Sequence, residues 1–178
     1  MRSGNLKSGF RNDDFRPLVF KTEDFGESWT KITSGLPDAP VNVIIEDPAK
    51  EGLLYLGNDQ GVYFSFDDGE HWEAFKNNMP PAPVKDLKIQ ASENDLIIGT
   101  YGRGAFIADT WPLQFINDSI FDQEAFLFPI EDKPQRNYSE RAWWGNYEQT
   151  GDNHIFSHNE PNGLALYYYL ESTPKDSA

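Results

Sequence analysis

Two eight-residue stretches decide the fold: Thr22-Glu23-Asp24-Phe25-Gly26-Glu27-Ser28-Trp29 and Ser65-Phe66-Asp67-Asp68-Gly69-Glu70-His71-Trp72. Both follow the pattern Ser/Thr-x-Asp-x-Gly-x-x-Trp, and they lie 43 positions apart. A motif that recurs at a fixed spacing of roughly 20–50 residues is the signature of a repeat architecture. The chain is therefore predicted to consist of tandem units of about 43 residues.

Other segments keep the same period. Pro37–Val41 recurs as Pro80–Val84, again 43 positions later. Two further pairs have offsets of 42 and 43, namely Leu54–Gly57 with Leu96–Gly99 and Gly61–Phe64 with Gly104–Ile107. Since separate segments share one spacing, the repeat covers most of the first half of the chain.

Each period contains four short apolar or aromatic segments bounded by Gly, Asn, Asp or Pro, the pattern of β-strands. In the complete copy these are Val41–Glu46, Leu53–Gly57, Gly61–Ser65 and His71–Phe75. A repeat of about 40–45 residues with four strands is typical of a β-propeller blade.

The first and third copies are incomplete. Pro17–Thr22 and Trp29–Thr33 supply only the last two strands of a blade. The third copy has Val84–Gln90, Asp95–Thr100 and Gly104–Asp109, with Ala125–Pro129 as a candidate fourth strand. The predicted fold is all-β: a partial β-propeller of about two and a half four-stranded blades over residues 1–110, with an irregular C-terminal extension.

The extension, residues 111–178, has lost the period. It is expected to form a short helix within Asn117–Glu124, a loop and a terminal strand at Leu164–Leu170. The loop contains Trp143-Trp144. Two interpretations stay open for these rings: burial against the propeller, or an exposed platform on which sugars stack.

Composition excludes several classes of function. The formal net charge is −14, which argues against nucleic acid and against an anionic membrane surface as partners. With no cysteine, disulfides, zinc–thiolate sites and thiol nucleophiles are excluded. No apolar window is long enough to span a membrane. No signal peptide is visible, so the protein is either cytosolic or a piece of a longer exported chain.

The repeated motif resembles the Asp-box, or BNR repeat, of sialidase-like propellers. Its hydroxyl and carboxylate groups can bond the backbone of a tight turn, its glycine can supply a positive φ, and its tryptophan is expected to be buried between blades. Asp24 and Asp67 occupy equivalent turns of neighbouring blades and do not converge, so no catalytic residue is assigned. The structural residues are Thr22, Asp24, Gly26, Trp29, Ser65, Asp67, Gly69 and Trp72.

Ligands of propellers usually meet the loops around the axis, which here include Asn58–Gln60 and Thr100–Arg103. The candidate ligand-binding residues are Asp59, Gln60, Tyr101 and Arg103, which could hydrogen-bond to or stack on a sugar or a peptide. Ordinary polar turn chemistry is the alternative. His154 and His158 stand four apart but in a segment rich in turn formers, so neither a metal site nor a cofactor is predicted.

A wider resemblance extends from about Asn12 to Leu170. Ile98–Gly104 with Ile107-Ala108-Asp109 resembles the final-blade segment of large bacterial BNR-repeat or glycosyl-hydrolase-like proteins, whose propeller is related to that of Vps10/sortilin ectodomains. Ala125–Pro129 and Asn159–Gly163 with Tyr168–Leu170 resemble their later strands. The arginine triad and Tyr–Glu pair of sialidases cannot be placed in this chain, so the resemblance carries no catalytic residue over.

The resemblance implies a non-catalytic propeller fragment of a larger exported protein that binds or scaffolds carbohydrate or protein ligands. The parent would be secreted, periplasmic or on the cell surface. The rest of its propeller, or self-association, would cover the open strand edges. Two alternatives remain: a glycoside hydrolase fragment that contributes one wall of a cleft, and a sortilin-like peptide-binding module.

Overall fold

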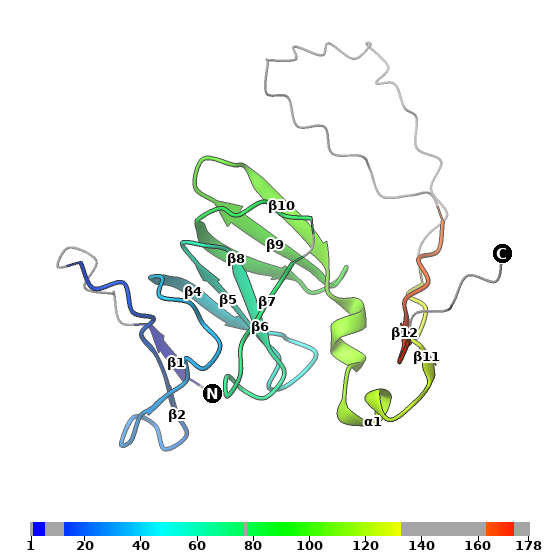
Figure 1. The fold of residues 1–178 in the computed structure, drawn as a ribbon, viewed down its shortest axis with the longest axis horizontal. Coiled ribbons are helices and arrows are strands. Elements are labelled where there is room, and N and C mark those ends of the chain that lie inside the picture. The colour runs from blue at the N-terminus through cyan, green and yellow to red at the C-terminus, as the bar shows by residue number, and fades with distance from the viewer. Residues whose placement is uncertain (1, 6–12, 77, 133–162, 173–178) are drawn as a thin grey trace, which may run out of the picture. The chain divides into compact units, whose positions relative to one another are not determined.

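The computed structural model describes residues 2–5, 13–76, 78–132 and 163–172. The chain separates into two compact units, Met1–Gln114 and Phe115–Ala178. The described residues form four antiparallel sheets and few helical turns, which confirms the all-β class (Figure 1). No helix in these ranges combines the length and the apolar character that a membrane span requires.

The middle sheet of the first unit is the complete four-stranded unit expected from the sequence. Strands β4 (Val41–Glu46), β5 (Leu54–Asn58), β6 (Val62–Ser65) and β7 (Glu73–Ala74) pair in chain order. Consecutive antiparallel strands joined by short turns produce this meander. The second Asp-box is the turn between β6 and β7.

The sheets on either side of it have three strands each (Figure 1). The first sheet contains β1 (Arg2–Asn5), β2 (Val19–Thr22) and β3 (Thr30–Lys31). The third sheet contains β8 (Val84–Gln90), β9 (Asp95–Thr100) and β10 (Ala105–Asp109). Strand β1 was not anticipated, because its four residues carry no apolar alternation.

The two faces of the middle sheet bury different residues, as strand alternation requires. Toward the first sheet, Leu54, Leu56 and Trp72 pack with Val19 and Ile32. Toward the third sheet, a second apolar cluster forms. Its buried members are Leu53, Tyr55, Val62, Val84, Leu87, Leu96 and Ile98. The core of this unit therefore consists of two interfaces between three successive sheets.

After β10 the chain leaves the repeat as a 3-10 helix, η2 (Trp111–Phe115). Thr110 donates its backbone N–H and its hydroxyl to Asn94 O, at 2.8 and 2.6 Å. Lys50 Nζ donates to Leu113 O at 3.3 Å, and Gln114 Nε2 donates to Asn94 Oδ1 at 3.1 Å. These bonds hold η2 against the turns at one end of the sheets.

The second unit contains α1 (Asp118–Phe121), β11 (Ala125–Leu127) and β12 (Tyr168–Leu170). Strand β11 pairs with β12, so the expectation that Ala125–Pro129 completes the third sheet is wrong. The physical reason is aromatic packing: the rings of Phe121 and Tyr169 meet edge to face at 5.5 Å between centroids. The terminal strand is also shorter than the predicted Leu164–Leu170.

Candidate functional site

The first Asp-box is a turn closed by its own side chains. Thr22 Oγ1 donates to Asp24 Oδ1 at 2.9 Å and accepts from the Gly26 backbone N–H at 2.8 Å. Asp24 also accepts from the Ser28 backbone N–H at 2.8 Å and from Ser28 Oγ at 2.5 Å. The threonine and the aspartate thus satisfy the backbone donors that a tight turn leaves unpaired.

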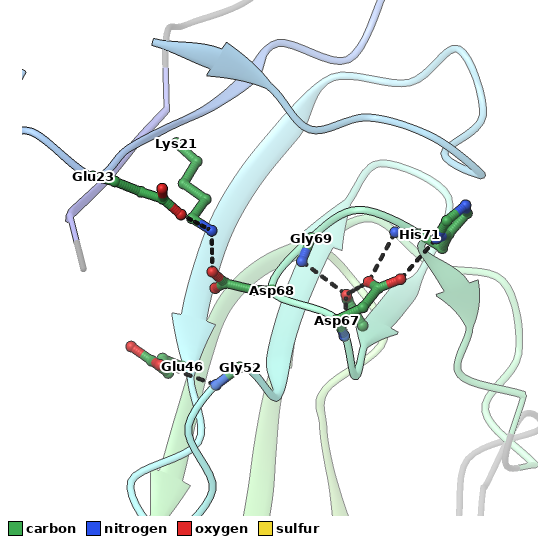
Figure 2. A network of polar contacts seen from close by, with 9 residues as sticks. Lys21, Glu23, Glu46, Gly52, Asp67, Asp68, Gly69 and His71 are labelled. Atoms are coloured by element: carbon green, nitrogen blue, oxygen red, sulfur yellow. Dashed lines mark hydrogen bonds and ion pairs between the residues drawn. The ribbon is translucent and has the colours of Figure 1, made fainter. Parts of the chain in front are cut away.

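The second Asp-box repeats this arrangement (Figure 2). Ser65 Oγ donates to Asp67 Oδ1 at 2.7 Å and accepts from the Gly69 N–H at 2.9 Å. Asp67 accepts from the His71 N–H at 2.9 Å, and its other oxygen lies 2.7 Å from His71 Nδ1. Both glycines have positive φ, +101° at Gly26 and +91° at Gly69, which is the conformation that glycine permits most cheaply.

The aspartates of both turns are held ionised. Hydrogen bonds from the Ser28 hydroxyl and backbone lower the pKa of Asp24 to about 2. Burial acts to raise the pKa of Asp67, but bonds from the His71 backbone, Ser65 and the His71 ring outweigh it, so that pKa is lowered. A carboxylate that stays charged cannot donate a proton near neutral pH. Both groups act on their own turns.

The two motif tryptophans have different surroundings. Trp72 is 3% exposed, and its Nε1 donates to Ile32 O at 3.0 Å. Trp29 is 49% exposed, and its Nε1 donates to Gly26 O of its own turn at 3.2 Å. The expectation that both rings are buried is wrong for Trp29, because no described sheet packs on its side of the first sheet.

A polar network that the sequence did not reveal joins the two turns (Figure 2). Lys21 Nζ forms ion pairs with Glu23, at 2.6 Å, and with Asp68. The lysine side chain is 16% exposed, and the partner carboxylates raise its pKa. The middle sheet has the apolar Phe64 at the equivalent position. Lys21 therefore forms an ion pair between the first and middle sheets, whereas Phe64 packs against apolar side chains between the middle and third sheets.

These groups line a pocket of about 470 Å³ beside the second Asp-box turn. Its lining residues are Lys21, Thr22, Glu23, Phe25, Glu46, Glu51 and Asp68. Lys21 is already paired, and Glu46 Oε1 accepts from the Gly52 N–H at 3.3 Å. The polar groups of Lys21 and Glu46 in the pocket wall are thus engaged in contacts that hold the turns.

Three potential metal-ligating groups, those of Asp67, Glu70 and His71, have ligand atoms within 4.8 Å of one another. All three are exposed. Asp67 and His71 are bonded to each other as part of the Asp-box turn, which accounts for their proximity. The other histidines considered from the sequence, His154 and His158, lie outside the described residues, as do Trp143 and Trp144.

The loops that carry the predicted ligand-binding residues have equivalent anchors. In the middle sheet, the Asp59 N–H donates to Pro40 O at 3.3 Å. In the third sheet, the Tyr101 N–H donates to Pro83 O at 2.8 Å. The two proline carbonyls belong to repeated segments, so the repeat places both loops at the same end of neighbouring sheets.

Asp59 spans the two sheets. Its Oδ1 accepts from Lys85 Nζ at 2.6 Å and from Asn42 Nδ2 at 2.8 Å, and Asn42 also donates to Val84 O at 2.8 Å. Burial acts to raise the pKa of Asp59, but the bonds from Lys85 and Asn42 outweigh it and the pKa is lowered. The sequence did not single out Lys85 or Asn42, because their roles depend on how the sheets face each other.

The remaining predicted residues are exposed at this end. Tyr101 is 74% exposed, and Gln60 and Arg103 also reach solvent. Gly102 and Gly104, on either side of Arg103, have φ of +79° and +76°, a conformation that few other residues adopt. The loop therefore presents an aromatic ring and a guanidinium to solvent.

No protein-family model matches this chain, and the search of curated proteins found no match. What the fold and the turns define is a class: an all-β protein whose repeated units form successive antiparallel sheets.

Proposed function

We propose that this chain is a non-catalytic, carbohydrate-binding module whose first, middle and third sheets are successive blades of a partial β-propeller. The 43-residue period, the matching Asp-box turns and the face-to-face packing of the sheets support the propeller assignment. Asp24 and Asp67 accept hydrogen bonds from the backbone of their own turns, which supports a structural role for both carboxylates.

One observation carries the ligand assignment: Tyr101 is 74% exposed while its own backbone N–H is fixed on Pro83 O. A ring held on an ordered backbone loses little conformational entropy when it stacks on a sugar. Arg103 and Gln60 supply hydrogen-bond donors beside it. The carboxylate of Asp59, a further predicted ligand-binding residue, is bonded to Lys85 and Asn42 and joins the middle and third sheets.

Binding of sialylated oligosaccharides and of β-glucan oligosaccharides to the whole chain, measured by calorimetry, tests this function. Tyr101→Ala should weaken binding about five- to tenfold, as the loss of a stacking contact of about 1–1.5 kcal/mol implies. Phe25→Ala is the matched control, because Phe25 is fully exposed on an Asp-box turn and should leave binding unchanged. An affinity equal in the wild type and Tyr101→Ala would contradict the proposal.

In the same proposal the module belongs to a larger exported protein, whose further blades or a second copy cover the side of the first sheet where Trp29 is half exposed. Size-exclusion chromatography with light scattering of the purified chain tests this part. Concentration-dependent self-association that Trp29→Lys weakens is the expected result. A stable monomer at all concentrations would count against it.

A further inference from the structure

The third sheet differs from the other two at its outer edge. In the first sheet β2 pairs with β3, and in the middle sheet β6 pairs with β7. In each pair the backbone hydrogen bonding continues by one residue. The Ile32 N–H donates to Val19 O at 3.0 Å, and the Phe75 N–H donates to Val62 O at 2.9 Å. Among the described residues, β10 pairs only with β9.

The local sequence explains why no strand in residues 110–132, the described stretch that follows β10, returns to pair with it. At an offset of 43, Thr110 stands where Asp67 is, and Pro112 stands where Gly69 is. Gly69 has φ of +91°, whereas the proline ring locks φ near −65°. The turn that returns the chain alongside the third strand therefore cannot form, and η2 follows instead.

The edge of β10 carries few of the usual protections against strand addition. Such edges normally contain charged residues, proline or a bulge, but β10 reads Ala-Phe-Ile-Ala-Asp, and its one charged residue is the last. Ile107 is 68% exposed and corresponds to Phe64, which lies opposite Glu73 on β7. The carbonyl of Ala105 corresponds to that of Val62, the acceptor of the Phe75 N–H.

We propose that β10 binds a short extended segment of another polypeptide, which adds antiparallel to it as the fourth strand of the third sheet. Strand addition of this kind draws its affinity from main-chain hydrogen bonds and its specificity from alternate side chains. The chain's own fourth strands define the chemistry, since Trp29-Thr30-Lys31-Ile32 and Trp72-Glu73-Ala74-Phe75 both end on an apolar residue. The net charge of −14 favours a neutral or basic segment.

A fluorescently labelled, end-capped peptide with the sequence of residues 71–76, His-Trp-Glu-Ala-Phe-Lys, is the probe, and anisotropy with the whole chain is the readout. The same peptide N-methylated at its phenylalanine lacks the donor for Ala105 O and should bind at least tenfold more weakly. Ile107→Pro should likewise reduce binding tenfold, because proline is tolerated on a strand edge but cannot donate. Ile107→Thr keeps the backbone donor and should bind within about threefold of the wild type.

Hydrogen exchange on the unliganded chain supplies the second measurement. The amides of β10 should exchange faster than those of β9 and become protected when peptide is added. Equal affinity for the methylated and unmethylated peptides would overturn the proposal, as would β10 amides already protected at every chain concentration. Protection that appears only at high chain concentration would assign the edge to a second copy and overturn it too. The methylated peptide keeps the test decisive even where Ile107→Pro fails to fold.

Discussion

Gly69 and Gly26 both have positive φ but different neighbours, which separates two reasons why a turn requires glycine. A Cβ added at Gly69 would lie 2.5 Å from Ile32 Cδ1, whereas at Gly26 its nearest contact would be 3.8 Å from the Trp29 ring. Both positions would force a side chain into positive φ. Only Gly69 also lies against the side chain of a neighbouring sheet.

Gly26→Ala should therefore lower the free energy of unfolding by about 1 kcal/mol, the cost of positive φ alone. Gly69→Ala should lower it by roughly 1–3 kcal/mol more, because the added methyl overpacks the interface. Urea denaturation of the two variants measures the difference. Equal losses would show that Ile32 yields without cost.

Asp24 makes a pH-dependent contribution whose sign follows from its pKa of about 2 in the folded chain. An unfolded aspartate has a pKa of about 3.9. Because the folded pKa is the lower one, the contribution is fully present above about pH 4 and is lost as the pH falls toward 2. Thermal unfolding of the wild type and Asp24→Asn between pH 2 and 6 should show curves that converge at the acid end. A gap between them that stays constant with pH would contradict this.

At the scale of elements, Trp72 joins the first and middle sheets. It is 3% exposed and donates to the carbonyl of Ile32 on the far side of the interface. Trp29 occupies the equivalent place in its own motif but is 49% exposed. The same eight-residue pattern thus produces one ring that stabilises an interface and one that does not.

Trp72→Ala should destabilise the chain by about 3–5 kcal/mol, the usual cost of removing a buried aromatic ring. Trp29→Ala should cost less than about 1 kcal/mol, because half of its surface already meets water. Chemical denaturation followed by far-ultraviolet circular dichroism measures both without relying on tryptophan emission. Similar losses for the two variants would mean that Trp29 is covered in solution.

The sequence predicted the strands that are determined by neighbouring residues along the chain. Strands β4, β8 and β9 have the predicted bounds, because apolar alternation and flanking turn residues determine them. Strand β1 lacks both signals and forms by pairing with β2. The pairing of β11 with β12 could not be read from the sequence either, since it joins segments that are far apart along the chain.

In the candidate site, too, contacts within one turn were predictable and contacts between sheets were not. The Asp-box bonds were predictable because donors and acceptors lie within four residues of each other. The contacts of Lys85 and Asn42 with Asp59 depend on two sheets that face each other. The exposure of Trp29 depends on a neighbour that the motif does not encode.

At the scale of the whole molecule, the proposed propeller requires that the first, middle and third sheets are copies of one unit, related by one repeated rotation. Positions 23, 66 and 109 are equivalent at the common offset of 43: Glu23 directly follows β2, Phe66 directly follows β6, and Asp109 is the last residue of β10. The chain contains no cysteine, so spin labels can be attached at engineered cysteines alone.

Pulsed dipolar electron spin resonance on the pairs Glu23→Cys/Phe66→Cys and Phe66→Cys/Asp109→Cys measures the two successive spacings. We expect the two distance distributions to coincide to within the width set by the labels, because in the proposed propeller one rotation carries each sheet onto the next. Two clearly different mean distances would contradict it, since the sheets would then be neighbours without being successive copies.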